Sequence, residues 1–496
     1  MRRHALLLMP LLLAAPVPIL AQGTEIPAHP GDLTFEPLAF EPPRAAEHRH
    51  TLPDGGVVFI VEDHALPLVD VSVMVRTGAW LEPPGKAGLA ALTGSQMRAG
   101  GTASLSAADF DEEAAFLAAQ IGSSIGDTLG QASLNCLTKD LDVALDLLFD
   151  MLRNPRFDQD RLDLAKSQML QAMERRNDST RSIEGREWGR LMRGDAHFST
   201  QPATRASVES ITREDLVAFH ERYYHPGGFI FAVSGDVVPE DVLAKLSARL
   251  EGWPTVSEPV PSVPAPAHDP RPALYGVDKP DVNQGRVSIG HLGTTRDNPD
   301  RYPLLVMNDI LGGGGFASRL LTRVRSDEGL AYSAGSSFGM GTYYDGVFRV
   351  AFQSRSETVA RAAAIVLEEV ERIRSEPVTD TELATAIASF VETFTRNFSS
   401  AAATAGLFAR DEYTGRDPEY LAHYRERISA VTADDVLRVA REYLHPDRLV
   451  MLVVGNLDAV EEGDPDNPEY ALEDLTGEPL ARIPLPDPFT MEYPVP

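Results

Sequence analysis

Residues 211–237 read ITREDLVAFHERYYHPGGFIFAVSGDV, and residues 431–457 read VTADDVLRVAREYLHPDRLVMLVVGNL. The two stretches align without a gap at an offset of 220 residues. In each, a threonine at the second position can cap a helix whose apolar residues have helical spacing, and a His-Pro pair ends the helix before an apolar run that ends in glycine. A shared order of this length indicates that the chain contains one domain twice.

The identical positions of the two copies include the residues that begin and end their elements. Because His225 and His445 recur at the same point of both copies, we expect them to serve local structure rather than to bind a ligand. The identical pairs are Thr212/Thr432, Asp215/Asp435, Tyr223/Tyr443, His225/His445, Pro226/Pro446, Val233/Val453 and Gly235/Gly455.

A proline-rich segment separates the two copies. Seven prolines lie between residues 254 and 272, too many missing amide donors for a helix or a central strand. This segment therefore reads as a semi-rigid extended linker between domains at 34–253 and 273–457. The tail, 458–496, is acidic and rich in proline, and we expect it to be irregular, either packed along the surface or disordered.

Within each half, apolar runs typical of strands flank amphipathic helical segments. VVFIVEDHALPLVDVSVMV (57–75) is an example of the first and ETVARAAAIVLEEVERI (357–373) of the second. Strands near both ends of a half, with helices between them, predict an α+β fold in which helices pack on a largely antiparallel sheet.

The first 21 residues have the pattern of a secretory signal peptide. A basic start is followed by an apolar run and then by Ala21 before a polar stretch. A membrane anchor is the competing interpretation, but Pro10, Pro16 and Pro18 and the short apolar length disfavour it. No later segment offers about twenty consecutive apolar residues. We therefore expect a periplasmic or secreted protein whose mature form has no membrane span.

The composition excludes some classes of partner. The 45 basic and 73 acidic residues give a net charge of −28, which makes nucleic acid a poor partner. The acidity could favour basic peptides, but it is spread along the chain like a solvated surface. Cys136 is the single cysteine, so the chain can form no internal disulfide, and its strand-like context predicts a buried, inert thiol.

Two further segments carry a resemblance to a known family. They are GAWLEPPGKAGLAALTGSQMRAGGT (78–102) and LGGGGFASRLLTRVRSDEGLAYSAGS (311–336). Together with the repeat, they resemble the pitrilysin/insulinase-type zinc metallopeptidases, in family order over nearly the whole mature chain. The resemblance implies that each half is a LuxS/MPP-like metallohydrolase domain, similar to those of mitochondrial processing peptidase.

The first segment lacks the residues that give this family its chemistry. In the family a helix carries His-x-x-Glu-His, whose histidines bind zinc while the glutamate activates the bound water. The matching positions here are Ala91, Gly94 and Ser95. The motif is therefore degenerate, and we expect the small Gly94 to reflect tight packing of this helix against another surface.

The remaining zinc ligand of the family is a glutamate on a later helix. The corresponding position here is Gln171 or Ala172, and Glu174 lies roughly a turn out of place. No histidine occurs from 65 to 196, and the polar cluster at 47–50, Glu-His-Arg-His, is expected to be surface rather than a metal site. We therefore predict no metal site and no bound cofactor in this chain, and zinc in a partner subunit instead.

The second segment, unlike the first, keeps the functional residues of the family, an arginine and a tyrosine. Arg325 and Tyr332 match the Arg/Tyr pair that reaches the active site from the C-terminal domain in this family. By this resemblance the guanidinium would hold a substrate carbonyl or carboxylate, and the phenol would donate to the developing oxyanion. The alternative is a surface arginine and a strand tyrosine packed in the core.

These observations favour a non-catalytic subunit of a periplasmic heterodimeric zinc metallopeptidase. Such a subunit would supply Arg325 and Tyr332 to a partner that carries the zinc site, for the proteolysis of peptides. The main alternative is a catalytically inert peptide-binding or scaffold homologue, for example a homodimer, that takes up extended peptides at a sheet edge. An autonomous hydrolase with other chemistry ranks below both, since no nucleophile and base stand together in the sequence.

Overall fold

A computed structural model describes residues 29, 33, 40–53, 55–255 and 258–494. The expected signal peptide lies outside the described residues. The chain divides into two units, Met1–Phe40 and Glu41–Pro496, and every described helix and strand lies in the second. None of the described helices combines the length and the apolar character that a membrane crossing requires.

The first half of the second unit builds a six-stranded sheet. Its order is β1-β2-β6-β3-β5-β4, and all its pairs are antiparallel except the parallel pair β2–β6. The strands are β1 (Arg49–Thr51), β2 (Val57–Glu62), β3 (Leu68–Val75), β4 (Gln120–Ile125), β5 (Gly130–Leu137) and β6 (Phe229–Gly235).

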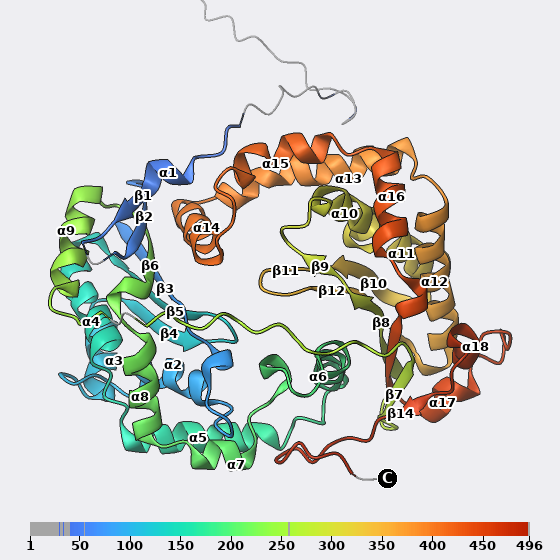
Figure 1. Ribbon diagram of the computed structural model, residues 1–496, viewed down its shortest axis with the longest axis horizontal. Helices are drawn as coiled ribbons and strands as arrows, with labels where there is room; N and C mark the ends of the chain where they lie inside the picture. Colours follow the sequence, from blue (N-terminus) through green and yellow to red (C-terminus); the bar gives the residue numbers. More distant parts are fainter. Residues whose placement is uncertain (1–28, 30–32, 34–39, 54, 256–257, 495–496) are drawn as a thin grey trace, which may run out of the picture. The chain divides into compact units, whose positions relative to one another are not determined.

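Helices of the same half cover one face of this sheet (Figure 1). Their apolar sides and the buried strand residues form one continuous core, in which Cys136 of β5 is 1% exposed. Burial raises the pKa of this thiol to about 11, as suits the inert cysteine expected. The helices of this half are α1 (Ala45–His48), α2 (Leu89–Ala99), α3 (Ala107–Phe116), α4 (Leu141–Arg153), α5 (Gln159–Met173), α6 (Thr180–Arg193), α7 (Arg205–Ser210), α8 (Arg213–Tyr223) and α9 (Pro239–Leu250).

The second half repeats the design. Its six-stranded sheet has the order β10-β12-β8-β13-β7-β14, so that β8 and β13 correspond to β3 and β6. The predicted α+β fold with mostly antiparallel sheets is confirmed. The strands are β7 (Leu274–Asp278), β8 (Gln284–Leu292), β10 (Ala331–Phe338), β12 (Val347–Arg355), β13 (Val450–Gly455) and β14 (Ala481–Arg482), with β9 (Thr294–Thr295) and β11 (Met340–Gly341) as a separate pair.

Helices also cover one face of the second sheet, and α10, α12 and α16 bury their apolar sides there. The helices of this half are α10 (Arg301–Asn308), α11 (Arg319–Leu321), α12 (Val359–Ser375), α13 (Asp380–Thr393), α14 (Ala401–Thr414), α15 (Tyr420–Ser429), α16 (Ala433–Tyr443), α17 (Leu457–Glu462) and α18 (Leu472–Thr476).

The repeated segment forms the predicted elements in both halves. Helices α8 and α16 each begin with a capping box, in which Thr212 and Asp215, or Thr432 and Asp435, bond reciprocally. His225 is 8% exposed, and burial lowers its pKa. His445 donates its backbone N–H to His291 Nε2 over 3.1 Å, a structural contact.

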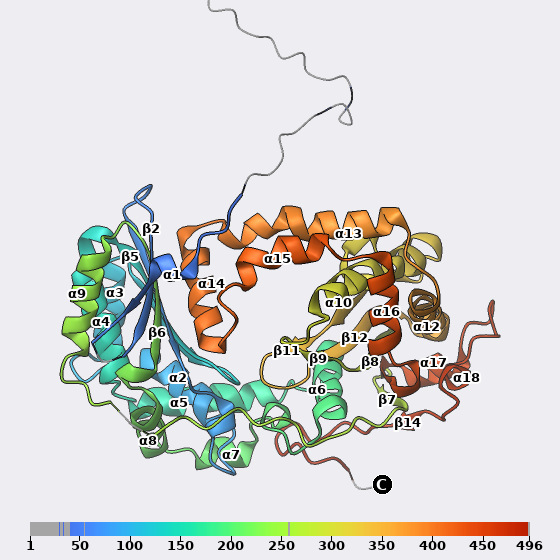
Figure 2. The same ribbon diagram turned by 45° about the horizontal axis from the view of Figure 1, so that its top comes forward.

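Each half donates one helix to the sheet of the other half. Helix α6, from the first half, packs on β8 and β13 of the second sheet. Helix α14, from the second half, packs on β2, β3 and β6, on the face opposite to α3, α4 and α9 (Figure 2). Both helices have 14 residues and follow a serine N-cap, so they are equivalent elements of the duplication.

Helix α6 makes a buried ionic contact with its host sheet. The Glu184 side chain is 2% exposed and accepts hydrogen bonds from Arg286 Nε at 2.7 Å and Arg349 Nη2 at 2.8 Å. It also accepts from Ser288 Oγ at 2.7 Å. Around it, Ile183, Trp188 and Met192 form an apolar cluster with strands β7 and β13. A buried carboxylate needs such partners because burial alone disfavours its charge.

The linker packs on the first half, and the tail packs on both halves. The described linker residues form neither helix nor strand, and the carbonyl of Pro261 accepts from Trp80 Nε1 at 3.2 Å. The expectation of an irregular tail is wrong in three places, because α17 and α18 are helices and β14 pairs parallel with β7 and extends the second sheet. Farther on, the Tyr493 hydroxyl donates to both carboxylate oxygens of Glu187 at 2.9 Å. The domain boundaries drawn from the sequence stay a prediction.

Candidate functional site

Helix α2 carries the three positions of the degenerate motif. Its start is set by Glu82, whose carboxylate accepts the N–H of Gly88 at 3.1 Å and of Ala90 at 2.7 Å. Gly88 has φ of 101°, a left-handed conformation that glycine adopts without strain. Burial raises the pKa of Glu82, and its two backbone hydrogen bonds oppose that rise.

The three positions of the degenerate motif differ in their exposure to solvent. Ala91 and Ser95 are exposed, whereas Gly94 is buried against β4. A Cβ atom on Gly94 would lie only 2.3 Å from the backbone nitrogen of Ile125. The surface that explains this glycine is therefore the edge strand of the chain's own first sheet, and a glutamate side chain has no room at the position of the general base.

These residues do not fit a zinc ion. Alanine and glycine offer no ligand atom, and the Ser95 hydroxyl donates to the carbonyl of Leu92 at 3.1 Å. On α5, the exposed Gln171 and Ala172 add no carboxylate, and Glu174 is exposed at the helix end. Throughout the part of the chain that the structure describes, no three His, Cys, Asp or Glu side chains come together as a metal site.

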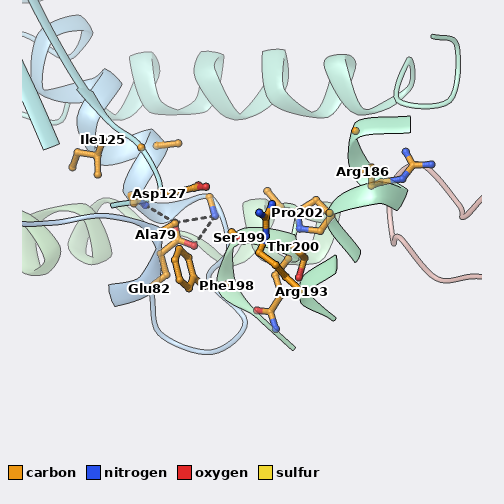
Figure 3. A pocket seen from close by; sticks show the side chains of 18 of the residues that line it. Ala79, Glu82, Ile125, Asp127, Arg186, Arg193, Phe198, Ser199, Thr200 and Pro202 are labelled. Atoms are coloured by element: carbon orange, nitrogen blue, oxygen red, sulfur yellow. Dashed lines mark hydrogen bonds between the residues drawn. The ribbon is translucent and has the colours of Figure 1, made fainter. Parts of the chain in front are cut away.

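A cavity of about 440 Å³ lies beside α2 (Figure 3). Ala91 is the one position of the degenerate motif that lines it, together with Met169 of α5. The charged side chains of its wall are Glu82, Asp127, Arg186 and Arg193, and no histidine is among the described residues that line it. The cavity thus lacks a metal ligand set, and the Glu82 carboxylate is engaged in capping the helix.

We expect Gly94→Leu to lower the free energy of unfolding by about 3 kcal/mol, because the new side chain must displace the backbone of β4. Ala91→Leu on the exposed face of the same helix is the matched control and should change stability by less than about 0.5 kcal/mol. Urea unfolding of the purified chain measures both. Equal stability of the two variants would show that α2 does not depend on contact with β4.

Arg325 and Tyr332 come together on the second half. Arg325 lies in the π-helical turn Thr322–Asp327, and Tyr332 lies near the start of β10. The guanidinium carbon of Arg325 stands 4.7 Å from the centre of the Tyr332 ring and 5.0 Å from that of Phe316. The side chains of Tyr332 and Phe316 are 83% and 77% exposed. Tyr332 is therefore not a core tyrosine, and the three side chains form an exposed stack.

Strand β10 presents this tyrosine through a local irregularity. Ala331 pairs with Ser354 and Ala334 with Phe352, which leaves Tyr332 and Ser333 outside the ladder with β12. Because β10 is an edge strand, its other side has no strand neighbour among the residues that the structure describes. The sequence did not single out Phe316, since one apolar residue after a glycine run has no periodicity that could mark it.

The two sets of predicted residues do not share a cavity. Tyr332 lines a separate cavity of about 540 Å³, and none of the residues lining it belongs to α2 or α5. Within this chain, the Arg/Tyr pair is thus not assembled with the degenerate motif into one site.

Comparison with known families is consistent with this geometry. A family model described as Insulinase (Peptidase family M16) matches residues 57–186, and one described as Peptidase M16 inactive domain matches residues 210–390. An uncharacterised zinc protease of Streptomyces coelicolor is 25% identical over 314 residues, which cover 62% of this chain and 68% of that protein.

Of two further similar proteins, one is named a non-peptidase homologue and the other is described as a peptidase M16 inactive domain. A non-peptidase homologue of Helicobacter pylori, YmxG, is 26% identical over 328 residues, or 64% of this chain and 73% of that protein. The crystal structure of a peptidase M16 inactive domain from Pseudomonas fluorescens superposes with a TM-score of 0.72 and 25% identity, over 82% of this chain and 97% of that one.

Proposed function

The chain belongs to the insulinase (peptidase M16) family, and from this premise we propose that it is the non-catalytic subunit of a heterodimeric zinc metallopeptidase. The zinc site belongs to a partner subunit of the same family. This chain supplies Arg325 and Tyr332 to the peptide that is cleaved there, in the periplasm or after secretion.

The exposed stack of Phe316, Arg325 and Tyr332 is the observation that carries the proposal. A guanidinium between two aromatic rings is held in place without using its hydrogen-bond donors. Tyr332 at 83% exposure keeps its hydroxyl free for an oxygen outside this chain. During hydrolysis the peptide carbonyl oxygen gains negative charge, and a preorganised pair of hydrogen-bond donors stabilises that charge.

The degenerate helix supports the other part of the proposal, the need for a partner. The base position in α2 is filled by the backbone of β4, and the flanking positions carry a methyl and a hydroxyl group. Hydrolysis by zinc-bound water therefore needs a second chain. The apolar N-terminal run, which lies outside the described residues, is the basis for assigning the complex to the periplasm or the exterior.

Co-purification with a family member that carries His-x-x-Glu-His, followed by zinc analysis and peptide cleavage, tests the proposal. We expect no stoichiometric zinc and no cleavage from the isolated chain, and both from the complex, with zinc in proportion to the partner. Full activity of the partner without this chain would refute the proposal, as would zinc bound by this chain alone.

A peptide-binding homologue without catalysis is the second candidate. The unpaired side of β10 supports it, since an extended peptide can add to an edge strand by main-chain hydrogen bonds. A stable homodimer that ignores zinc-bearing homologues and binds peptides without turnover would favour this function over the first.

A further inference from the structure

The cavity beside Tyr332 is lined by residues that the sequence did not predict to lie together. Its volume is about 540 Å³, and it lies where the first turn of α6 meets strands β8, β10 and β12. It exists in this form because α6, from the first half of the chain, packs on the second sheet. The lining residues that carry the argument are Arg181, Arg286, Arg355, Tyr332, Gln284 and Gln353.

The charge of this cavity is opposite to that of the chain. Three arginines line it, and no acidic residue is among its described lining residues, although the chain carries a net charge of −28. Arg181 and Arg355 are exposed, and neither forms an ion pair with any residue that the structure describes. Two uncompensated guanidinium groups facing one cavity attract an anion and repel a cation.

The third arginine is held in a fixed orientation. Arg286 Nε donates to the buried Glu184 at 2.7 Å, and its Nη1 donates to the Gln353 side-chain oxygen at 2.9 Å. Glu184 also neutralises Arg349, at 2.8 Å from its Nη2, so one carboxylate serves two guanidinium groups. One carboxylate therefore does not offset the three lining arginines together with Arg349.

From this arrangement we infer that the cavity binds a carboxylate of a peptide, either an acidic side chain or the free C-terminus. A planar guanidinium binds a carboxylate through parallel hydrogen bonds. The amide of Gln284 and the hydroxyl of Tyr332 add neutral donors on the same wall. The inference rests on the proposed function in one respect, namely that the ligand is a peptide.

The position of the cavity on the sheet favours a peptide over other anions. It opens beside Tyr332 and Ser333, which leave the ladder between β10 and β12. A peptide that adds along the free side of β10 would carry its side chains or its C-terminus to the arginines. Nucleic acid would instead meet the repulsion of an acidic chain.

Fluorescence anisotropy with the isolated full chain tests this inference. The probes are a short labelled peptide that contains glutamates, the same peptide with glutamines, and both again with an amidated C-terminus. We expect the glutamate peptide with a free C-terminus to bind best. Loss of affinity on Glu to Gln exchange identifies a side chain as the ligand, and loss on amidation identifies the C-terminus. Equal binding of all four peptides would overturn the inference.

The double variant Arg181→Glu/Arg355→Glu should weaken binding of the best peptide by at least about tenfold, because both free guanidinium groups are replaced by like charges. Arg161→Glu is the matched control, since Arg161 is also exposed and also lies in the first turn of a helix, α5, away from the cavity. Unchanged binding by the double variant, or equal loss in the control, would refute the site.

The assay separates this inference from the proposed function. It contains neither zinc nor a partner, so a failure to assemble with a zinc-bearing subunit leaves its outcome intact. Conversely, the complex could be active while replacement of Arg181 and Arg355 leaves its peptide affinity unchanged. That result would support the proposed function and refute the carboxylate site.

Discussion

Tyr332→Phe is expected to lower kcat of the assembled peptidase by about 100-fold or more, the usual effect of removing one oxyanion donor. The phenylalanine ring keeps the stack with Arg325, whose guanidinium carbon lies 4.7 Å from the ring centre, so only the hydroxyl is lost. Because the side chain is 83% exposed, the stability of the chain should not change. Steady-state kinetics of the complex, with the wild-type partner, gives the comparison.

The control for this experiment is Tyr470→Phe, in the tail, which removes a hydroxyl from a partly buried ring that packs on the second core. It should leave kcat unchanged. If Tyr332→Phe raises KM but keeps kcat, the hydroxyl binds substrate without acting on the transition state. If neither parameter changes, Tyr332 has no part in the reaction, and the claim that this chain supplies a donor to the partner's site is lost.

The second large effect concerns the exchanged helix. Glu184→Ala should lower the free energy of unfolding by about 3–5 kcal/mol, since it leaves the guanidinium groups of Arg286 and Arg349 without their buried counter-charge. The Ser288 hydroxyl loses its acceptor as well. Urea unfolding measures the change, with the exposed Glu214→Ala in the first turn of α8 as the control.

A variant that removes the whole ionic network makes this test sharper. Replacing Glu184 with leucine and both arginines with methionine should recover much of the lost stability, because apolar residues need no counter-charge. A loss in Glu184→Ala no larger than in the control would mean that α6 does not depend on this network. Recovery in the apolar variant would show that the cost arises from unpaired charges rather than from lost packing.

Much of the fold could be predicted because its signals are local. The capping boxes of Thr212 and Thr432, the His-Pro stops and the apolar strand runs each lie within a few residues of one another. The degenerate motif is equally local, since Ala91, Gly94 and Ser95 lie on one helix. The pairing of β14 with β7 was missed because Ala481 and Arg482 have no apolar alternation, and the pairing rests on backbone groups.

The arginine cavity could not be predicted for a different reason. Arg181, Arg286 and Arg355 are far apart in the sequence, and each stands among other charged residues of an ordinary surface pattern. They meet because α6 crosses to the second sheet. An amphipathic helix shows its apolar side in the sequence, but it does not show which of two equivalent sheets that side will cover.

The sequence by itself determined the duplication, the α+β fold of both halves and the absence of zinc ligands on α2, since these depend on residue identity and on spacing within single elements. The tertiary structure alone decided that α6 and α14 exchange sheets and that Gly94 lies against the backbone of β4. It also decided that Tyr332 stands exposed beside three arginines. The reason is physical, because contacts between distant elements depend on how their surfaces pack together. The periodicity of a helix or strand does not identify the element against which it packs.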